Sequence, residues 1–164
     1  MNIQIKDDFL EKDISDTILK TLSSSDFPYY FQNHQAFIDE DVEDQFFFQH
    51  IVMTNEQKIN STYFNNLDNL FLKKLNYKNL FRVKINFNTN QNKTVASAYH
   101  IDFKEKHKVA IYYVNTNNGI TEFKNGKKIS CVQNRLLTFD GDIEHRSISQ
   151  TDTKYRIVIN VNYE

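Results

Sequence analysis

The stretch FRVKINF, residues 81–87, alternates apolar and polar side chains with a period of two. Successive side chains of a β-strand point to opposite faces of a sheet, so this alternation predicts a strand with one face in the core. Further β-prone runs follow at 109–114, 129–132, 135–139 and 155–163. Asn117-Asn118-Gly119 and Asn125-Gly126 are turn signals between these runs. Many short strands with little helix predict an antiparallel sandwich or barrel.

The first 80 residues combine helical and strand signals. Ile14, Ile18 and Leu22 recur at helical spacing and predict a helix that ends at the serine run 23–25. Similar signals predict strands at 3–5 and 46–53, a polar loop at 33–44 and a helix over 63–75. We therefore expect a mainly β fold with flanking helices. One domain is expected over residues 1–164, in which 1–80 support a strand-rich core formed by 81–164.

Size and composition favour a globular protein without a strong overall electrostatic field. The chain has 164 residues, of which 40% are hydrophobic and 14% aromatic, and its formal net charge is -1. This balance gives no general attraction to nucleic acid or membrane, although a local basic patch remains open. Cys131 is the single cysteine and lies in an apolar run, so we expect a buried, unreactive thiol in a reducing compartment. Acidic residues near Met1 and the lack of a long apolar run indicate a cytoplasmic protein.

The residues of most chemical interest are His100, Asp102 and His145, which read H-x-D, a gap of 42 residues, then H. Side chains two residues apart in a strand share a face, so His100 and Asp102 can bind one ion from one strand end. A distant strand end can then supply His145. Two imidazoles and one carboxylate with open positions are the ligand set of non-haem Fe(II) oxygenases. Zinc binding and chance occurrence are the alternatives.

Two cations follow the second histidine. Lys154 and Arg156 stand nine and eleven residues after His145, at the start of an apolar strand and on one face of it. Either side chain can reach a carboxylate bound beside the metal, and arginine offers a two-pronged fork for it. An arginine that enters a buried strand needs an anion to offset its desolvation. We therefore favour Arg156 over Lys154; the alternative is a surface charge.

Several motifs together resemble those of the Fe(II)/2-oxoglutarate-dependent oxygenases, and most closely the prolyl hydroxylase branch. The matching segments are 99–102, 110–115, 119–123, 134–140, His145 and 156–160, in the order and approximate spacing of that family. The resemblance covers about 81–163. Segments 8–10 and 26–30 are similar to small oxygenases encoded by bacteriophages, which would place the protein in the host cytoplasm.

The resemblance implies a fold and a set of site residues. The fold is a double-stranded β-helix, that is, a jelly-roll or cupin-like core. His100, Asp102 and His145 match the iron ligands. The residues that it assigns to the cosubstrate are Arg156 or Lys154 and Tyr113 at the distal carboxylate, Ile111 beside the cosubstrate, and Asn86 where relatives often have a tyrosine.

The resemblance also implies an activity. The cofactors would be Fe(II), 2-oxoglutarate as cosubstrate and O₂, with ascorbate as a reductant. The reaction would hydroxylate a C–H bond of a protein or peptide side chain, with proline as a candidate, and decarboxylate 2-oxoglutarate to succinate. The same chemistry on a nucleobase or a small metabolite is a second hypothesis, and a non-catalytic cupin-like binding module is a third. The oligomeric state stays open.

Overall fold

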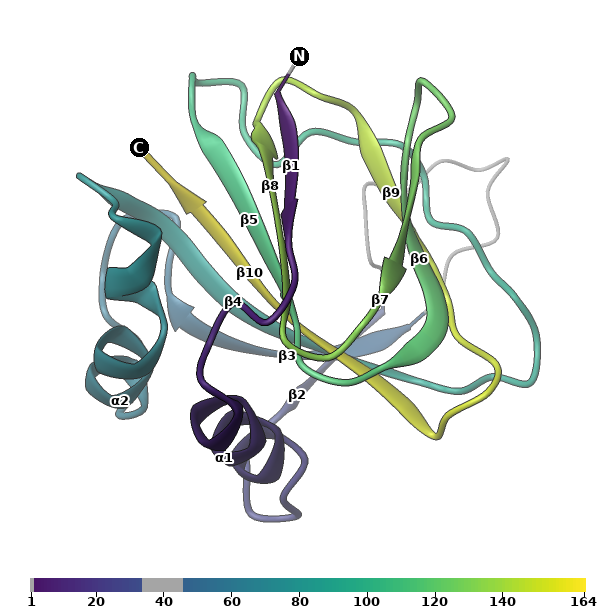
Figure 1. Ribbon diagram of the computed structural model, residues 1–164, viewed down its shortest axis with the longest axis horizontal. Helices are drawn as coiled ribbons and strands as arrows, with labels where there is room; N and C mark the ends of the chain where they lie inside the picture. Colours follow the sequence, from purple (N-terminus) through teal and green to yellow (C-terminus); the bar gives the residue numbers. More distant parts are fainter. Residues whose placement is uncertain (1, 34–45) are drawn as a thin grey trace.

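The computed structural model describes residues 2–33 and 46–164. In chain order the elements are β1 (Ile3–Lys6), α1 (Lys12–Leu22), β2 (Tyr30–Gln32), β3 (Phe47–Met53), α2 (Phe64–Leu70), a 3₁₀ helix (Leu72–Leu75), β4 (Leu80–Thr89), β5 (Lys108–Tyr113), β6 (Asn117–Phe123), β7 (Lys128–Cys131), β8 (Arg135–Asp140), β9 (His145–Ile148) and β10 (Tyr155–Tyr163). Strands dominate, and α1 and α2 both lie in the N-terminal half (Figure 1).

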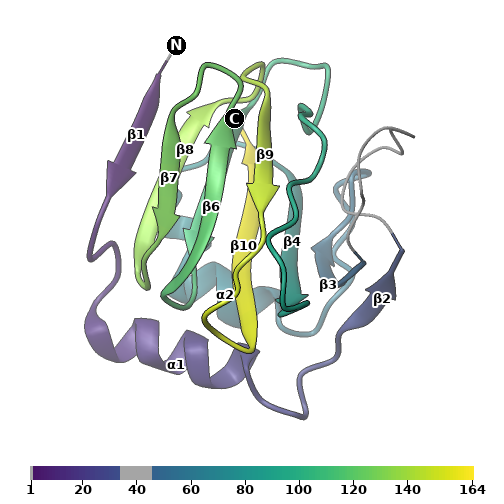
Figure 2. The same cartoon turned by 90° about the vertical axis from the view of Figure 1, so that its right-hand side faces the viewer.

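The strands form two antiparallel sheets. The major sheet has the order β1-β8-β5-β10-β4-β3-β2, and the minor sheet has the order β7-β6-β9. The minor sheet lies in front of the major sheet, as Figure 2 shows. This arrangement is the double-stranded β-helix, so the predicted fold class is confirmed. The N-terminal residues do more than support the core, because β1, β2 and β3 are themselves strands of the major sheet.

The two faces of the major sheet pack into different hydrophobic clusters. Helices α1 and α2 cover the face that points away from the minor sheet (Figure 1). Ile85 and Ile159 pack in the same core cluster as the helical residues Ile18 and Leu67. Val158, one position away on β10, belongs instead to the cluster between the sheets. The period-two alternation of the sequence thus divides each central strand between two cores.

Strand β4 places polar side chains between the sheets. It pairs with β10 in a register that sets Asn86 opposite Val158 and Lys84 opposite Asn160. Val83 and Ile85 are buried toward the helices, so the alternate side chains point the other way. We call the set Arg82, Lys84, Asn86 and Asn88 the polar row of β4. The alternation that predicts the strand therefore also brings four polar side chains to one face.

Three local predictions are wrong: the helix over 63–75, the turn at 117–119 and the strand end at His100 and Asp102. The helix expected over 63–75 is interrupted at Phe71, whose φ is -133°, and continues only as a 3₁₀ turn. Phe71 and Leu72 are both fully buried. The core side of the segment thus continues through the break, although the α-helical backbone does not. Asn117-Asn118-Gly119 is not a turn but the start of β6, where the Asn117 Oδ1 accepts the Gly119 N–H at 2.9 Å.

The other sequence-based elements agree with the structure to within one or two residues, including the hairpin turn at Asn125-Gly126 between β6 and β7. The predicted loop at 33–44 lies almost wholly outside the described residues. No helix within residues 2–33 and 46–164 combines the length and apolar character that a membrane span requires.

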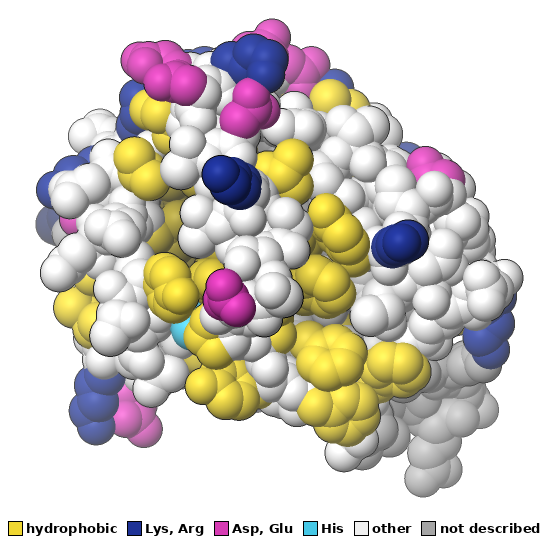
Figure 3. Space-filling view, turned by 90° about the horizontal axis from the view of Figure 1, so that it is seen from below, with side chains coloured by type: hydrophobic (Ala, Val, Ile, Leu, Met, Phe, Trp, Pro, Cys, Tyr) yellow, Lys and Arg dark blue, Asp and Glu magenta, His cyan; other side chains and the backbone are white. Residues whose placement is uncertain are grey.

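Aromatic side chains gather where the major sheet ends at β2. Tyr30 and Phe31 are more than half exposed, and Phe46 is 41% exposed. The Phe31 ring lies 5.9 Å from that of Phe46 and 5.7 Å from that of Phe48. The space-filling view in Figure 3 shows apolar side chains collected beside the residues that are not described. The described residues at this edge of the sheet therefore form an apolar surface.

The close approach of His107 to Gly141 supports a stability prediction. A Cβ on Gly141 would lie 2.2 Å from the His107 ring, which is buried and anchored to the Glu105 carbonyl at 2.7 Å. Gly141→Ala should therefore lower the free energy of unfolding by about 1–3 kcal/mol, the usual cost of overpacking. Urea unfolding measures this. Gly126→Ala, where a Cβ meets nothing within 4 Å but φ is 88°, separates steric overlap from backbone strain. An unchanged midpoint for Gly141→Ala would contradict the prediction.

Candidate metal centre

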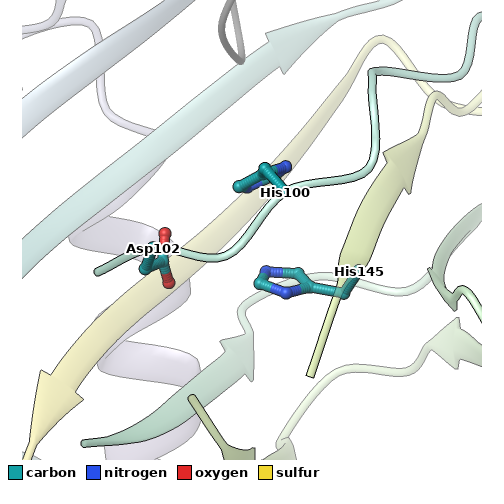
Figure 4. A group of neighbouring side chains, drawn as sticks. All are labelled: His100, Asp102 and His145. Atoms are coloured by element: carbon teal, nitrogen blue, oxygen red, sulfur yellow. The ribbon is translucent and has the colours of Figure 1, made fainter. Parts of the chain in front are cut away.

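The sequence-predicted triad comes together at one end of the space between the sheets. One potential ligand atom from each of His100, Asp102 and His145 lies within 4.8 Å of the others. Figure 4 shows the three side chains around one space, with His145 on β9 and the other two on the segment that precedes β5. Donors from two segments that are distant in sequence therefore meet at bonding scale for a single ion.

The backbone fixes two of these residues to each other. His100 and His145 form an isolated antiparallel bridge in which each N–H donates to the other residue's carbonyl at 3.0 Å. The strand predicted for His100 and Asp102 is wrong, because His100 has only this bridge and Asp102 lies in a bend. His100 and Asp102 therefore do not share one face of a strand. Instead, pairing of His100 with β9 places the two imidazoles side by side, with 4.7 Å between ring centroids.

Both imidazoles are oriented for metal binding by backbone carbonyls. The Nδ1 of His100 lies 3.1 Å from the Ala98 oxygen, and the Nδ1 of His145 lies 3.2 Å from the Ile143 oxygen. A carbonyl oxygen only accepts, so Nδ1 carries the hydrogen in each ring. The lone pair then resides on Nε2, which is the arrangement of metal-binding histidines whose second nitrogen is held by a backbone acceptor.

The carboxylate of Asp102 is held at both oxygens. Oδ1 accepts from Arg82 Nη2 at 2.7 Å, and Oδ2 accepts from Asn162 Nδ2 at 2.8 Å. The Arg82 guanidinium also lies over the Phe103 ring, 4.7 Å from its centroid. Burial alone would raise the pKa of Asp102, but the cations Lys84 and Arg82 and the Asn162 hydrogen bond bring that pKa well below its usual range. Asp102 is therefore ionised and fixed in orientation.

Burial keeps the histidines neutral. It lowers the pKa of His145 to about 4, with His100 acting in the same direction, and it also lowers the pKa of His100. Metal ions bind the neutral imidazole, so both side chains are in the binding form at neutral pH. Burial likewise lowers the pKa of Lys84 to about 8, which leaves its amine mostly protonated at pH 7.

These shifts predict how stability of the metal-free protein depends on pH. The folded-state pKa of His145 lies below the unfolded value of about 6.5, so below pH 6.5 the unfolded chain takes up a proton that the folded protein does not. The free energy of unfolding should fall by about 2 kcal/mol between pH 7.5 and pH 5 from this residue alone. Urea unfolding in a chelator at both pH values measures the change. His145→Gln should show a shallower dependence, and an equal slope would contradict the assignment.

A small cavity of about 60 Å³ lies beside the triad. Of the sequence-predicted site residues, those that line it are His100, His145, Arg156, Asn86 and Ile111. Tyr113 does not line the cavity; its hydroxyl donates to Thr121 Oγ1 at 2.8 Å, and Thr121 does line it. Lys154 precedes β10, has an exposed side chain and does not line the cavity either. The placement therefore favours Arg156 over Lys154.

Arg156 is a buried cation surrounded by neutral acceptors. It is 3% exposed, and its guanidinium contacts the Ser147 hydroxyl, the Cys131 sulfur at 3.0 Å and Thr121 Oγ1 at 3.5 Å. Among the described residues no carboxylate pairs with it. Gly119 leaves room for its stem, since a Cβ there would lie 3.0 Å from the Arg156 Cδ. A buried guanidinium without an anion is a site for a carboxylate ligand.

Several buried polar atoms beside the cavity also lack a hydrogen-bond partner among the described residues. Asn86 Oδ1, Asn88 Nδ2 and Asn160 Oδ1 are buried without a hydrogen-bond partner within the described residues, and all three side chains line the cavity. Buried polar groups are normally satisfied, so these atoms indicate a polar ligand. The His-Asp-His set, the unpaired guanidinium and these amides fit a divalent metal together with a small dianion.

The sequence-based prediction did not include most of the residues that surround the triad and Arg156. The missed residues are Arg82, Lys84, Ser147, Thr121, Asn160 and Asn162. Asn160 and Asn162 alternate with Val161 in an otherwise apolar strand, and this polar alternation was the available signal. The expected inert Cys131 is buried, as predicted, but it also contacts Arg156. His50 and His107 are buried away from the triad, and their Nδ1 atoms are hydrogen-bonded to the backbone carbonyls of Pro28 and Glu105. His34 lies outside the described residues.

Comparison with known proteins finds similarity in structure only. No known family profile matches the chain, and no curated protein matches it in sequence. Solved structures do match over nearly the whole chain. A Trichoplax adhaerens prolyl hydroxylase in complex with a hypoxia-inducible factor peptide fragment has a TM-score of 0.64 at 18% identity and covers 98% of this chain and 82% of its own.

Two other solved structures extend the comparison. A 2OG-Fe(II) oxygenase family protein from Burkholderia pseudomallei has a TM-score of 0.67 at 9% identity, covering 99% of this chain and 84% of its own. SnoN, a non-heme alpha-ketoglutarate-dependent epimerase from nogalamycin biosynthesis, has a TM-score of 0.65 at 11% identity, covering 99% and 77%. At these identities the likeness shows a shared fold.

Proposed function

We propose that this protein is an Fe(II)- and 2-oxoglutarate-dependent dioxygenase that hydroxylates a C–H bond of a peptide side chain. One observation carries the proposal: two neutral histidines of a His-Asp-His triad and a buried arginine without an anion line the same cavity. Neither feature alone specifies this reaction. Together they fit a divalent metal, which the triad would hold, and a small dicarboxylate, whose negative charge the arginine would offset.

Named residues would hold each group. The Nε2 atoms of His100 and His145 and a carboxylate oxygen of Asp102 would bind the metal. Arg156, with the hydroxyls of Ser147 and Thr121, would hold the distal carboxylate of 2-oxoglutarate. Arg82 and Asn162 would keep the Asp102 carboxylate in its orientation. The surrounding apolar side chains Ile111 and Val158 would exclude water from the cosubstrate.

The bound iron and cosubstrate would supply the oxidising power. Overall, the substrate C–H, O₂ and 2-oxoglutarate become the alcohol, succinate and CO₂. Of the four electrons that reduce O₂, two come from the decarboxylation of 2-oxoglutarate and two from the C–H bond. One oxygen atom enters succinate and the other enters the new hydroxyl group, so the reaction needs no further reductant. Ascorbate would only keep idle iron in the ferrous state.

A peptide substrate is favoured by the prolyl hydroxylase-like motifs and by the structural neighbour in complex with a peptide. Proline is the first side chain to test. A small metabolite is the second candidate, because the fold is shared with an epimerase of nogalamycin biosynthesis. The net charge of -1 gives less support to nucleic acid.

Succinate formation tests the proposal directly. The purified protein is incubated with Fe(II), 2-oxoglutarate, ascorbate and air, with and without a peptide mixture, and succinate is measured. We expect succinate that requires both Fe(II) and O₂ and that disappears with a chelator. Anaerobic Fe(II) titration shows whether the metal is bound. Bound iron without any succinate would reject the enzyme and favour a non-catalytic binding module.

A further inference from the structure

Lys84 is a cation at the cavity that the mechanism above does not use. It lies on β4 between the core residues Val83 and Ile85, so its own side chain points into the space between the sheets. It lines the cavity beside the triad together with His100 and Asn160. Placing a lysine in the middle of a central strand costs desolvation free energy, so we expect this side chain to have a functional role.

The other cations of this region are already engaged. Arg82 pairs with Asp102 at 2.7 Å, and Arg146 pairs with the buried Glu122. Arg156 is hydrogen-bonded to three neutral side chains and would hold the distal carboxylate of 2-oxoglutarate. Lys84 has no hydrogen-bond or ion-pair partner among the described residues; Asp102 acts on it only through longer-range attraction. Its ammonium is therefore available to an incoming anion.

Lys84 also stands between two spaces. Besides the cavity of about 60 Å³ at the triad, it lines an open groove of about 440 Å³ over β3 and β4. The other residues of the groove are Gln49, Ile51, Thr54, Asn55, Glu56 and Arg82. The small cavity suits the cosubstrate, whereas the groove has room for a larger molecule. Lys84 is the residue that the two spaces share, so a molecule in the groove would lie beside a cation that also lines the cavity at the triad.

Lys84 and Arg156 reach the cavity from well-separated positions of the major sheet. In the register of β4 and β10, Arg156 lies opposite Asn88, and Lys84 is four residues further along β4. At a rise of about 3.3 Å per residue the two backbone positions are separated by about 13 Å along the strand. The Arg156 guanidinium is also drawn toward the minor sheet by Ser147. The two cations therefore approach the cavity from different directions, Arg156 beside the minor sheet and Lys84 beside the groove over β3 and β4.

We propose that Lys84 selects a prime substrate that carries a carboxylate close to the C–H bond to be oxidised, namely an acidic peptide side chain. This inference rests on the proposed function and names the substrate class of the same site. A charge-assisted hydrogen bond from the ammonium would fix the carboxylate. Phosphate-bearing chains fit less well, because the groove offers one unpaired cation and also contains Glu56.

Matched peptides test the inference. A mixture of synthetic peptides is prepared in which every member with Asp or Glu has a counterpart with Asn or Gln, and products that gain one oxygen are measured by mass spectrometry. The wild type should hydroxylate acidic members at a rate at least about tenfold higher than their amide counterparts. This factor corresponds to the free energy of one charge-assisted hydrogen bond. Lys84→Met and Lys84→Gln should remove this preference. Lys74→Met, which removes an exposed lysine from the 3₁₀ helix, should retain it.

Two results would overturn the inference. One is hydroxylation of acid and amide peptides at equal rates, or of no acidic peptide, by protein that forms succinate. The other is a Lys84→Met protein whose KM for 2-oxoglutarate rises while its acid preference persists, which would assign Lys84 to the cosubstrate. Succinate formed without peptide shows that the proposed function holds independently of Lys84. If iron-bound wild type forms no succinate at all, the proposed function fails and the inference falls with it.

Discussion

His145→Ala is expected to abolish metal binding and, with it, succinate formation. The Nε2 of His145 is one of three donors, and its ring is held by the Ile143 carbonyl and by the backbone bridge to His100. Loss of a ligand should weaken binding more than loss of an outer-shell partner does, hence by more than about 100-fold. Mn(II) is a suitable probe, because it does not undergo the oxidation that complicates Fe(II).

The measurement is the metal-dependent shift in Tm. Wild type with Mn(II) at about 100 times its Kd should gain about 2.7 kcal/mol of stability, and His145→Ala should gain nothing. The ring also packs on Phe139 at 4.8 Å between centroids, so the variant without metal is compared with His145→Gln, which retains more of the side-chain volume. An equal Mn(II)-dependent rise in Tm for wild type and both variants would place the metal elsewhere.

Arg156→Met is expected to raise the KM for 2-oxoglutarate by about 100-fold while leaving Mn(II) binding unchanged. The guanidinium is buried, and a charged hydrogen bond to a carboxylate in such a place is worth about 2–3 kcal/mol. Lys154→Met is the matched control, because this cation stands two residues earlier, is exposed and does not line the cavity. It should leave KM unchanged.

A truncated cosubstrate separates lost recognition from general damage. 2-Oxobutanoate retains the groups that would bind the metal but lacks the distal carboxylate. Wild type should strongly prefer 2-oxoglutarate, whereas Arg156→Met should treat the two acids nearly alike. A large effect of Lys154→Met together with a small effect of Arg156→Met would reverse the assignment and give the distal carboxylate to Lys154.

Periodic strands were the most predictable part of the fold. In FRVKINF the apolar positions face the helices and the polar positions face the minor sheet, so sequence and structure agree along β4. Prediction failed where tertiary contacts override a local signal. Asn117-Asn118-Gly119 has turn chemistry, but Gly119 is needed within β6 because Arg156 passes over it. The helix expected through Phe71 is interrupted there, where φ is -133° and the periodic apolar pattern gives no sign of the break.

The residues of the candidate site were likewise only partly predictable from the sequence. The H-x-D pattern and the distant histidine identify three residues that do converge. The partners of Asp102 could not be found in this way, because Arg82 lies 20 positions before it and Asn162 lies 60 positions after it. Only the register between β4 and β10 brings these two side chains together. Long-range strand pairing is not encoded in any local pattern, and the shell around the triad depends on it.

The backbone bridge between His100 and His145 has a consequence for how the chain can vary. The spacing of the two imidazoles is set by a pair of peptide groups and not by the length of the 44 positions that connect them. Insertions at the exposed tip Asn125-Gly126, or shortening of the surface segment near Lys104, would leave that spacing intact. The spacing of the two imidazoles is thus insulated from loop-length change, and such loops are the places where natural or engineered variation can remodel the rim without separating the two histidines.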